Sequence, residues 1–214
     1  MLYPIEGNRW ILTLTGVGRD YPPNDEAGFL SFARSLRSPM LYEAIKEAQA
    51  LSPIYCYRCT DNRLRHYERV PSWPNELVVL GDAVCAFNPI YGQGMTAAAQ
   101  AALTLGQCLR QQLPPSGDSP IGQTQVFQKR LAKVNATPWL LATGEDLRWP
   151  TTEGDQLAMS HRLLQWYVDR VRLLSHQNPE ALREFLEVLH MVKPPTTLFQ
   201  PAFILSVLKQ AAIG

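Results

Sequence analysis

The segment of residues 77–109 constrains the fold most, because three local patterns follow one another in it without a break. A short apolar run at 77–80, β-branched at its centre, predicts a strand buried on both faces, as in a parallel sheet. The run ends abruptly at Gly81 and Asp82. A loop with proline and glycine then leads into an alanine-rich helix over 95–109. A strand–loop–helix unit is therefore expected.

This unit predicts a ligand site, because open α/β sheets bind ligands beyond the carboxyl ends of their strands. The Asp82 carboxylate can accept hydrogen bonds from ligand hydroxyls, and Gly81 lets the backbone approach closely. The helix that begins near Gln93 or Met95 offers unpaired N–H groups and the positive end of its dipole to an electron-rich group. A plain turn followed by a tight loop before a core helix is the alternative.

The string GDAVCAFNPIYGQGM, residues 81–95, resembles the second flavin-binding motif of the FAD-dependent aromatic hydroxylases and epoxidases. That motif has Gly-Asp-Ala, a proline several residues on, and Gly-Gln-Gly opening a helix. The sequence CAFNPIYGQGM is most similar to the corresponding segment of bacterial hydroxylases and olefin epoxidases related to squalene epoxidase, including those that act on polyether precursors. The resemblance covers residues 1–112 well and the remainder only loosely.

The resemblance implies that Asp82 binds the ribityl part of FAD and that Pro89 lies beside the isoalloxazine. The peptide N–H groups of residues 92–95 would face its N1 and C2 carbonyl edge, where reduced flavin carries negative charge. The implied cofactor-binding residues are Gly81, Asp82, Pro89, Gly92, Gln93, Gly94 and Met95. Neither a catalytic residue nor a metal ligand is assigned.

The function that the resemblance implies is that of an FAD-dependent oxidoreductase of the monooxygenase or epoxidase type. In this class a flavin hydroperoxide delivers one oxygen atom to an apolar or aromatic small molecule, and NADPH or a partner reductase supplies electrons. The protein positions the reactants and excludes water. A flavin-dependent reductase of isoprenoid chains is an alternative, because its fingerprint overlaps at Gly-Asp.

Two motifs of that superfamily are absent from this sequence: the Gly-x-Gly-x-x-Gly turn that holds the pyrophosphate, and the Asp-Gly motif between the two flavin motifs. We therefore expect the C-terminal half of such an enzyme, or a non-catalytic remnant or interaction subunit of the same fold. A buried strand at 77–80 also needs parallel neighbours, so self-association or a companion chain is expected. A nucleophilic hydrolase is disfavoured, because no Gly-x-Ser-x-Gly elbow occurs.

The expected fold class is α/β or mixed α+β, with part of a substrate sheet and a helical C-terminal tail. The expected domains are residues 1–76 with a partial sheet and two helices, 77–112 as the second half of the FAD-binding domain, 113–121 as a linker, and 122–214 as a helical region. The patterns predict a hairpin turning at residues 6–8, a helix capped by Asn24 or Asp25, a second opened by Pro39, and a strand at 54–60. Further helices are expected at 122–135, 155–175, 179–191 and 196–212.

Composition narrows the class of partner. With 46% hydrophobic and 18% charged residues and a net charge of +1, the chain is typical of globular proteins and offers no electrostatic basis for binding nucleic acid. Neither a signal sequence nor a transmembrane run is recognisable, so cytoplasmic residence is expected.

Cys56 and Cys59 have redox or zinc spacing, but a strand would point them to opposite faces. Cys85 and Cys108 are expected to be small buried side chains.

Two further groups stay open between a functional and a structural interpretation. His66, near Arg63, Arg65 and Arg69, would meet an anionic substrate or the NADPH phosphate, or would lie on a solvated charged strand. Aromatic side chains would line a pocket over the flavin or belong to the core. These aromatic residues are Tyr55, Tyr57, Trp73 and Phe87.

Overall fold

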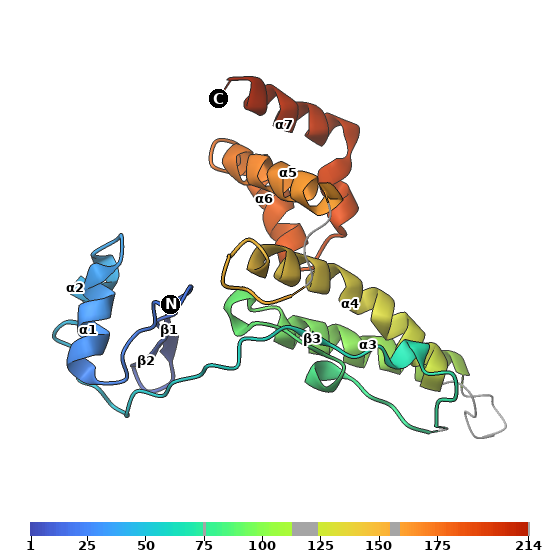
Figure 1. The fold of residues 1–214 in the computed structure, drawn as a ribbon, viewed down its shortest axis with the longest axis horizontal. Helices are drawn as coiled ribbons and strands as arrows, with labels where there is room; N and C mark the ends of the chain where they lie inside the picture. The colour runs from blue at the N-terminus through green and yellow to red at the C-terminus, as the bar shows by residue number, and fades with distance from the viewer. Residues whose placement is uncertain (75, 113–123, 155–158, 214) are drawn as a thin grey trace. The chain divides into compact units, whose positions relative to one another are not determined.

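The computed structural model describes residues 1–74, 76–112, 124–154 and 159–213. It combines many helices with two small antiparallel sheets (Figure 1). The coarser prediction of a mixed α+β chain is therefore confirmed. The chain divides into two compact units, residues 1–59 and 60–214. The division falls after Cys59, whereas the sequence placed the first boundary after residue 76.

The first unit opens with the predicted hairpin. Strands β1 (Leu2–Ile5) and β2 (Arg9–Leu12) pair antiparallel, with Tyr3 opposite Ile11. Gly7 and Asn8 turn the chain with φ values of 74° and 54°, a region open to glycine and tolerated by asparagine.

Two helices follow in the same unit. Asp25 caps α1 (Glu26–Ser35), as predicted, because its Oδ1 accepts a hydrogen bond of 2.8 Å from the Gly28 N–H. Pro39 precedes the short helix α2 (Met40–Ile45), against which α1 packs.

The second unit begins with short elements that pack on two long helices. Strand β3 (Arg63–Leu64) pairs antiparallel with β4 (Cys85–Ala86). The short 3-10 turns are η1 (Tyr67–Arg69), η2 (Gly81–Ala83) and η3 (Pro89–Tyr91). Helix α3 (Gly94–Gln112) packs against α4 (Thr124–Asp146). Turn η2 contacts α3, and η1 contacts α4.

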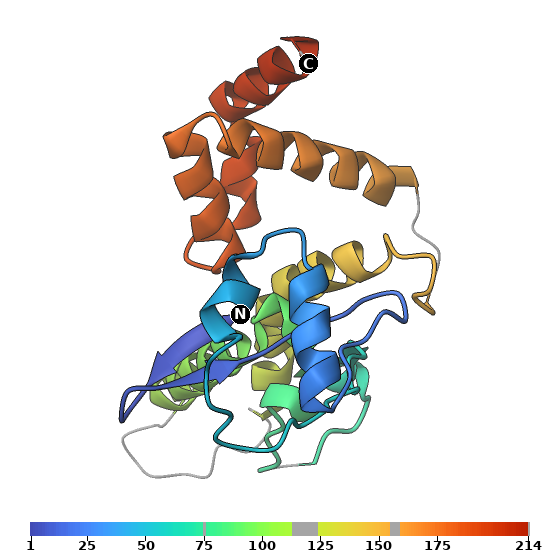
Figure 2. The same ribbon diagram turned by 90° about the vertical axis from the view of Figure 1, so that its left-hand side faces the viewer.

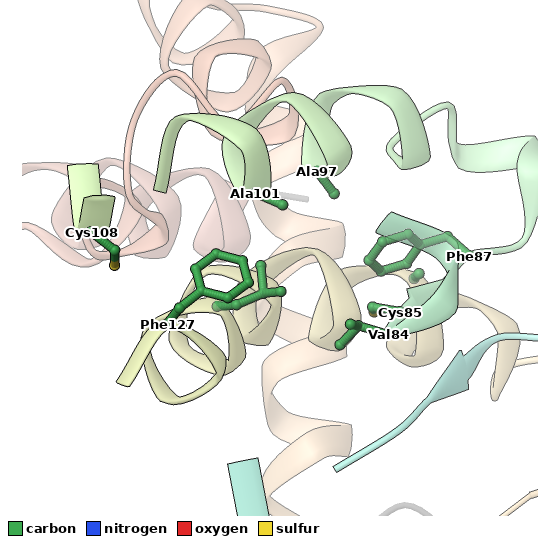
Figure 3. Close-up of a cluster of buried hydrophobic side chains, with 9 residues drawn as sticks. Val84, Cys85, Phe87, Ala97, Ala101, Cys108 and Phe127 are labelled. Carbon is green, nitrogen blue, oxygen red and sulfur yellow. The ribbon is translucent and has the colours of Figure 1, made fainter. Parts of the chain in front are cut away.

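Small side chains let α3 approach its neighbours closely. Ala97 and Ala101, one helical turn apart, face the core together with Phe127 of α4 (Figure 3). The buried cluster comprises Val84, Cys85, Phe87, Ala97, Ala101, Cys108, Phe127, Leu131 and Ala142. This core fixes the loop at residues 84–87 and the first turns of α3 against α4.

The C-terminal helices form a second buried cluster within the same unit. Helix α5 (Met159–Ser175) packs against α6 (Pro179–Leu189) and α7 (Pro201–Ile213) (Figures 1 and 2). Turn η4 (Pro195–Phe199) joins α6 to α7. The Tyr167 hydroxyl donates a hydrogen bond of 2.5 Å to the Leu198 carbonyl oxygen. The prediction of a helical C-terminal region is confirmed for the described residues.

The predicted strand at 77–80 is wrong. In the described residues both sheets are two-stranded and antiparallel, and residues 77–80 belong to neither. The side chains of Val78, Val79 and Leu80 do pack on the first core cluster. Side chains, rather than neighbouring strands, donate hydrogen bonds to the backbone of this segment. The buried Gln128 amide donates to the Val79 carbonyl oxygen at 2.9 Å, and the Trp73 indole N–H donates to the Leu77 carbonyl oxygen at 2.8 Å.

Two other expectations also differ from the structure. Residues 54–60 form no strand and pair with no other strand in the described part of the chain, and Tyr55 and Tyr57 are 82% and 69% exposed. The helix predicted to end at 135 continues through Pro138 to Asp146. Proline removes one helical hydrogen bond, but Pro138 is itself buried in the packed face of α4. The predicted linker 113–121 lies outside the described residues.

Candidate functional site

The Gly-Asp pair forms a turn beside α3 rather than a strand end. Gly81 has φ of +62°, and its carbonyl accepts a hydrogen bond of 2.9 Å from the Val84 N–H. Asp82 is exposed, and its carboxylate has neither a hydrogen bond nor an ion pair within the described part of the chain. The Arg65 guanidinium donates to the Ala83 carbonyl at 3.3 Å, which places one cationic group next to the turn.

The loop before α3 places Pro89 at the start of η3 and Gly92 at its end. Gly92 has φ of +66°, and its N–H donates to the Pro89 oxygen at 3.1 Å. Gly94 begins α3, and Met95 in its first turn is 86% exposed. A Cβ at Gly81, Gly92 or Gly94 would meet no atom within 4 Å, so open space lies in front of all three backbones.

Gln93 is buried at the N-terminus of α3, with 4% of its surface exposed. Its backbone carbonyl accepts the first hydrogen bond of the helix, from Ala97 N–H at 2.9 Å. Its side-chain Oε1 is buried and has no partner in the described structure. A buried acceptor without a donor is costly, so this oxygen is a natural contact for a ligand N–H.

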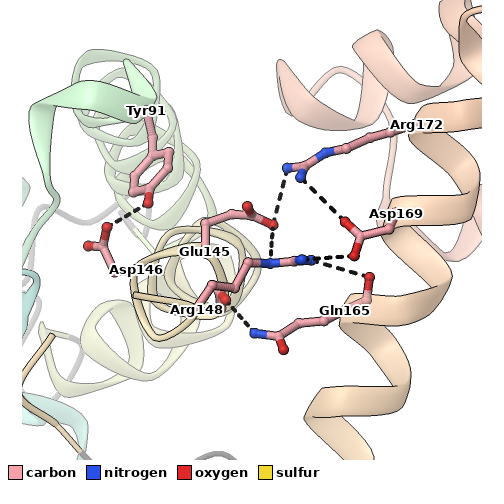
Figure 4. Close-up of polar contacts among 8 residues, drawn as sticks. Tyr91, Glu145, Asp146, Arg148, Gln165, Asp169 and Arg172 are labelled. Atoms are coloured by element: carbon pink, nitrogen blue, oxygen red, sulfur yellow. Dashed lines mark hydrogen bonds and ion pairs between the residues drawn. The ribbon is translucent and has the colours of Figure 1, made fainter. Parts of the chain in front are cut away.

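The Asp146 carboxylate, at the end of α4, holds the loop before α3 through hydrogen bonds. The Tyr91 hydroxyl donates to its Oδ1 at 2.5 Å (Figure 4). The Asn88 side-chain amide reaches the same carboxylate at 3.1 and 3.3 Å, and the Asn62 amide at 2.5 Å. The Asn62 side-chain Oδ1 in turn accepts a hydrogen bond from the Asn88 backbone N–H at 2.8 Å. We call these four residues the Asp146 cluster.

The Asp146 cluster was not foreseen from the sequence. Asn88 is part of the predicted motif, and its Asn-Pro dipeptide is typical of a turn. Its partner Asp146 lies 58 residues further on, with no motif around it. Burial raises the pKa of Tyr91 above its ordinary value of 10.0, and the hydrogen bond and negative charge of Asp146 raise it further. The phenol therefore remains a neutral donor.

An ion-pair network joins the end of α4 to α5. Arg148 contacts Asp169 at 2.9 Å and Glu145 at 3.3 Å, and Arg172 contacts Glu145 at 3.1 Å (Figure 4). The Gln165 amide adds a hydrogen bond of 2.7 Å to the Gly144 carbonyl. These contacts hold the helix end that carries Asp146.

The remaining predicted residues lie in several places. His66 Nδ1 is 2.8 Å from Glu68 Oε1 at the surface, an arrangement that favours the structural interpretation of this charged segment. Trp73 packs edge-on against Tyr67, with ring centroids 5.5 Å apart. Phe87 belongs to the core, whereas Tyr55 and Tyr57 are exposed residues of the first unit.

A cavity of about 430 Å³ lies elsewhere in the second unit. It is lined by α3, α4 and the segment after α6, including Leu103, Val134 and Val192. None of the seven predicted cofactor-binding residues lines it. In the described residues, no group of three or more His, Cys, Asp or Glu side chains is arranged to hold a metal, and no helix is long and apolar enough to span a membrane.

Comparisons with known proteins yield a similarity to one curated protein but assign no family. No family model matches the chain. The chain is 28% identical over 188 residues to protein Rv3254 of Mycobacterium tuberculosis (strain ATCC 25618 / H37Rv). This alignment covers 79% of the chain but only 39% of Rv3254. The chain thus spans about two fifths of its relative's length, and the similarity assigns no activity to it.

Proposed function

We propose that the chain carries the isoalloxazine- and ribityl-binding part of an FAD site, in a flavin-dependent oxidoreductase of the monooxygenase or epoxidase type. The open space in front of Gly81, Gly92 and Gly94, beside the N-terminus of α3, carries this proposal. Glycine has no side chain, so the open space in front of these three backbones lets a flat ring approach them closely. The resemblance of residues 81–95 to a flavin-binding motif supports the same conclusion.

The chemistry of the surrounding groups fits this part of the cofactor. The Asp82 carboxylate, which has no partner among the described residues, can accept hydrogen bonds from ribityl hydroxyls. The first N–H groups of α3 favour the electron-rich edge of a reduced ring. The Gln93 Oε1 atom offers an acceptor to a ring N–H.

When bound, FAD would supply the electron transfer and oxygen activation needed to oxygenate an apolar or aromatic molecule. The chain's own residues would bind the ring, orient it and exclude water from it. The Asp146 cluster would keep the loop at Pro89 in its binding conformation. Arg65, next to the Gly81–Ala83 turn, would add a positive charge near the site.

Titration of the purified chain with FAD, FMN and riboflavin, followed by flavin fluorescence, tests this proposal. In the proposed site the candidate residues would contact only the flavin and ribityl portions, so FAD and FMN should bind with similar affinity. Asp82→Ala removes a charged acceptor and should weaken binding by about 1.5–3 kcal/mol, or roughly 10- to 150-fold. Asp20→Ala, an exposed carboxylate of the first unit, is the matched control.

A folded chain that binds none of the three flavins would overturn the proposal. A non-catalytic remnant or interaction subunit of the same fold would then be the better explanation. Equal affinities of the wild type and Asp82→Ala would also contradict it, because binding would then not use the Gly81–Ala83 turn.

A further inference from the structure

The four cysteines fall into two physically different pairs. Cys85 and Cys108 are buried in the first core cluster of the second unit. Burial raises the pKa of the Cys85 thiol to about 12, with a smaller contribution from the charge of Asp82. Cys56 and Cys59 are both exposed and three residues apart. Only the second pair is accessible to a reagent in solution.

A strand at residues 54–60 would point the Cys56 and Cys59 thiols to opposite faces, but these residues form no strand. Residues 53–62 form neither helix nor strand and run as an open trace (Figure 1). Within the described structure, residues 54–60 make no backbone–backbone hydrogen bond. A turn that brought the thiols together would therefore break no hydrogen-bonded ladder.

The side chains between the two cysteines offer little resistance to such a turn. Tyr57 is largely exposed. The Arg58 guanidinium lies 5.9 Å from the centre of the Tyr21 ring. An exposed contact of this kind contributes only about 0.5–1 kcal/mol. The segment can therefore exchange its open conformation for a closed one.

We propose that Cys56 and Cys59 are a site of reversible disulfide formation. An extended chain separates residues three apart by roughly 10 Å, whereas a disulfide needs Cα atoms about 4.4–6.8 Å apart, so residues 56–59 fold into a turn on oxidation. The reaction partner is a small disulfide such as oxidised glutathione.

The exchange proceeds in two balanced steps. One thiolate attacks a glutathione sulfur, which forms a mixed disulfide and releases one glutathione thiolate. The second cysteine, as thiolate, attacks the protein sulfur of this mixed disulfide and releases the second glutathione thiolate. The protein loses two protons and two electrons, and oxidised glutathione becomes two reduced molecules.

Thiol counting on the full chain tests the proposal. A thiol-specific chromogenic reagent should detect two thiols in the native reduced protein and all four after unfolding, since two of the four are buried. After treatment with oxidised glutathione and removal of the reagent, the native count should fall to zero and the unfolded count to two. Dithiothreitol should restore both counts.

Peptide mapping locates the bond. Trypsin cleaves the unfolded protein after Lys46, Arg58 and Arg63, so the two cysteines fall on peptides 47–58 and 59–63. The oxidised protein should release these peptides joined by one disulfide. Cys56→Ser and Cys59→Ser should each retain a glutathione adduct on the remaining exposed thiol, because the second thiolate is missing.

Three results would overturn the proposal. Persistent glutathione adducts on both cysteines of the wild type would show that the segment does not close. A disulfide that joins two copies of the chain would move the chemistry to an intermolecular contact. Thiols that resist oxidation until a zinc chelator is added would identify a metal site instead.

Discussion

At the scale of single residues, Asp146 connects parts of the chain that the sequence keeps far apart. Its carboxylate accepts hydrogen bonds from Asn62, Asn88 and Tyr91, which are 84, 58 and 55 residues away. Partly buried bonds to a charged acceptor are stronger than those between neutral groups. The Pro89 turn therefore keeps its shape without help from a ligand.

Tyr91 gives the Asp146 cluster a pH dependence at high pH. The pKa of Tyr91 is raised in the folded protein above its ordinary value of 10.0, by burial and by Asp146. Its contribution to stability is therefore complete below pH 10.0, where the phenol is protonated in both states. Above that pH the unfolded chain loses the proton first, so the free energy of unfolding should fall as pH rises.

Urea denaturation of the wild type and Tyr91→Phe from neutral pH to above pH 10 measures this dependence. At neutral pH the variant should lose about 1–2 kcal/mol, because the Asp146 carboxylate loses a donor. Above pH 10 its stability should fall less steeply than that of the wild type. Tyr57→Phe, at an exposed position, should cost little at neutral pH. Equal slopes for the wild type and Tyr91→Phe would contradict the assigned role.

At the scale of elements, the contact between α4 and α5 depends on charged side chains that are only partly exposed. Arg148 is 25% and Asp169 is 46% exposed, so solvent weakens each pair. We expect a coupling energy of about 0.5–1 kcal/mol between these two residues, decreasing at high salt. A double-mutant cycle with Arg148→Ala and Asp169→Ala, unfolded at low and high salt, measures it.

The pair Arg183 and Glu187 on α6 provides the control for that cycle. Its arginine is 74% exposed, and the two side chains lie one turn apart on one helix. Its coupling should be smaller than that of Arg148 and Asp169, because the more exposed pair is better screened. A coupling energy near zero for Arg148 and Asp169 would show that this ion pair does not hold α5 against α4.

The elements most readily predicted from the sequence are those with local signals. The hairpin has a glycine turn, α1 has its Asp25 cap, and α3 begins at Gly-Gln-Gly as expected. The strands expected at 54–60 and 77–80 fail because a strand needs neighbours, and a local pattern cannot state whether these exist. The end of the helix predicted at 135 is also wrong, because tertiary packing outweighs the local cost of placing Pro138 inside a helix.

The residues of the candidate site also differ in whether a local sequence pattern reveals them. The glycines and Asp82 belong to one contiguous motif, so the sequence could single them out, although their flavin-binding role stays a prediction. The Asp146 cluster and the pairing of Gln128 with the Val79 carbonyl join distant segments through side chains. Such contacts depend on how α4 packs against the segments that precede α3. No spacing rule therefore reveals them.

At the scale of the whole molecule, the two units differ sharply in how much apolar surface they bury. In the first unit Ala33 and Ile45 are the buried residues, while Tyr3, Trp10 and Ile11 of its hairpin are each more than half exposed. A two-stranded hairpin is marginally stable by itself. The second unit contains both core clusters.

This difference predicts unequal protection against amide hydrogen exchange. The described amides of residues 1–59 should exchange through local opening that costs little free energy, because few buried contacts must be broken. The amides of α3 and α4 around the first core cluster should exchange only on global unfolding of the second unit. Exchange followed by mass spectrometry, with peptides from both units in one experiment, gives the comparison directly.

Equal, slow exchange in both units would contradict this expectation, whether the protection came from a second polypeptide on the hairpin or from the first unit alone. Concentration dependence separates the possible sources. Protection of residues 1–59 that increases with protein concentration would identify a second copy of the chain as the partner. Slow exchange at every concentration would instead mean that the first unit is stable by itself despite its small core. Rapid exchange at all concentrations would leave Tyr3, Trp10 and Ile11 as an uncovered surface, available to a companion chain.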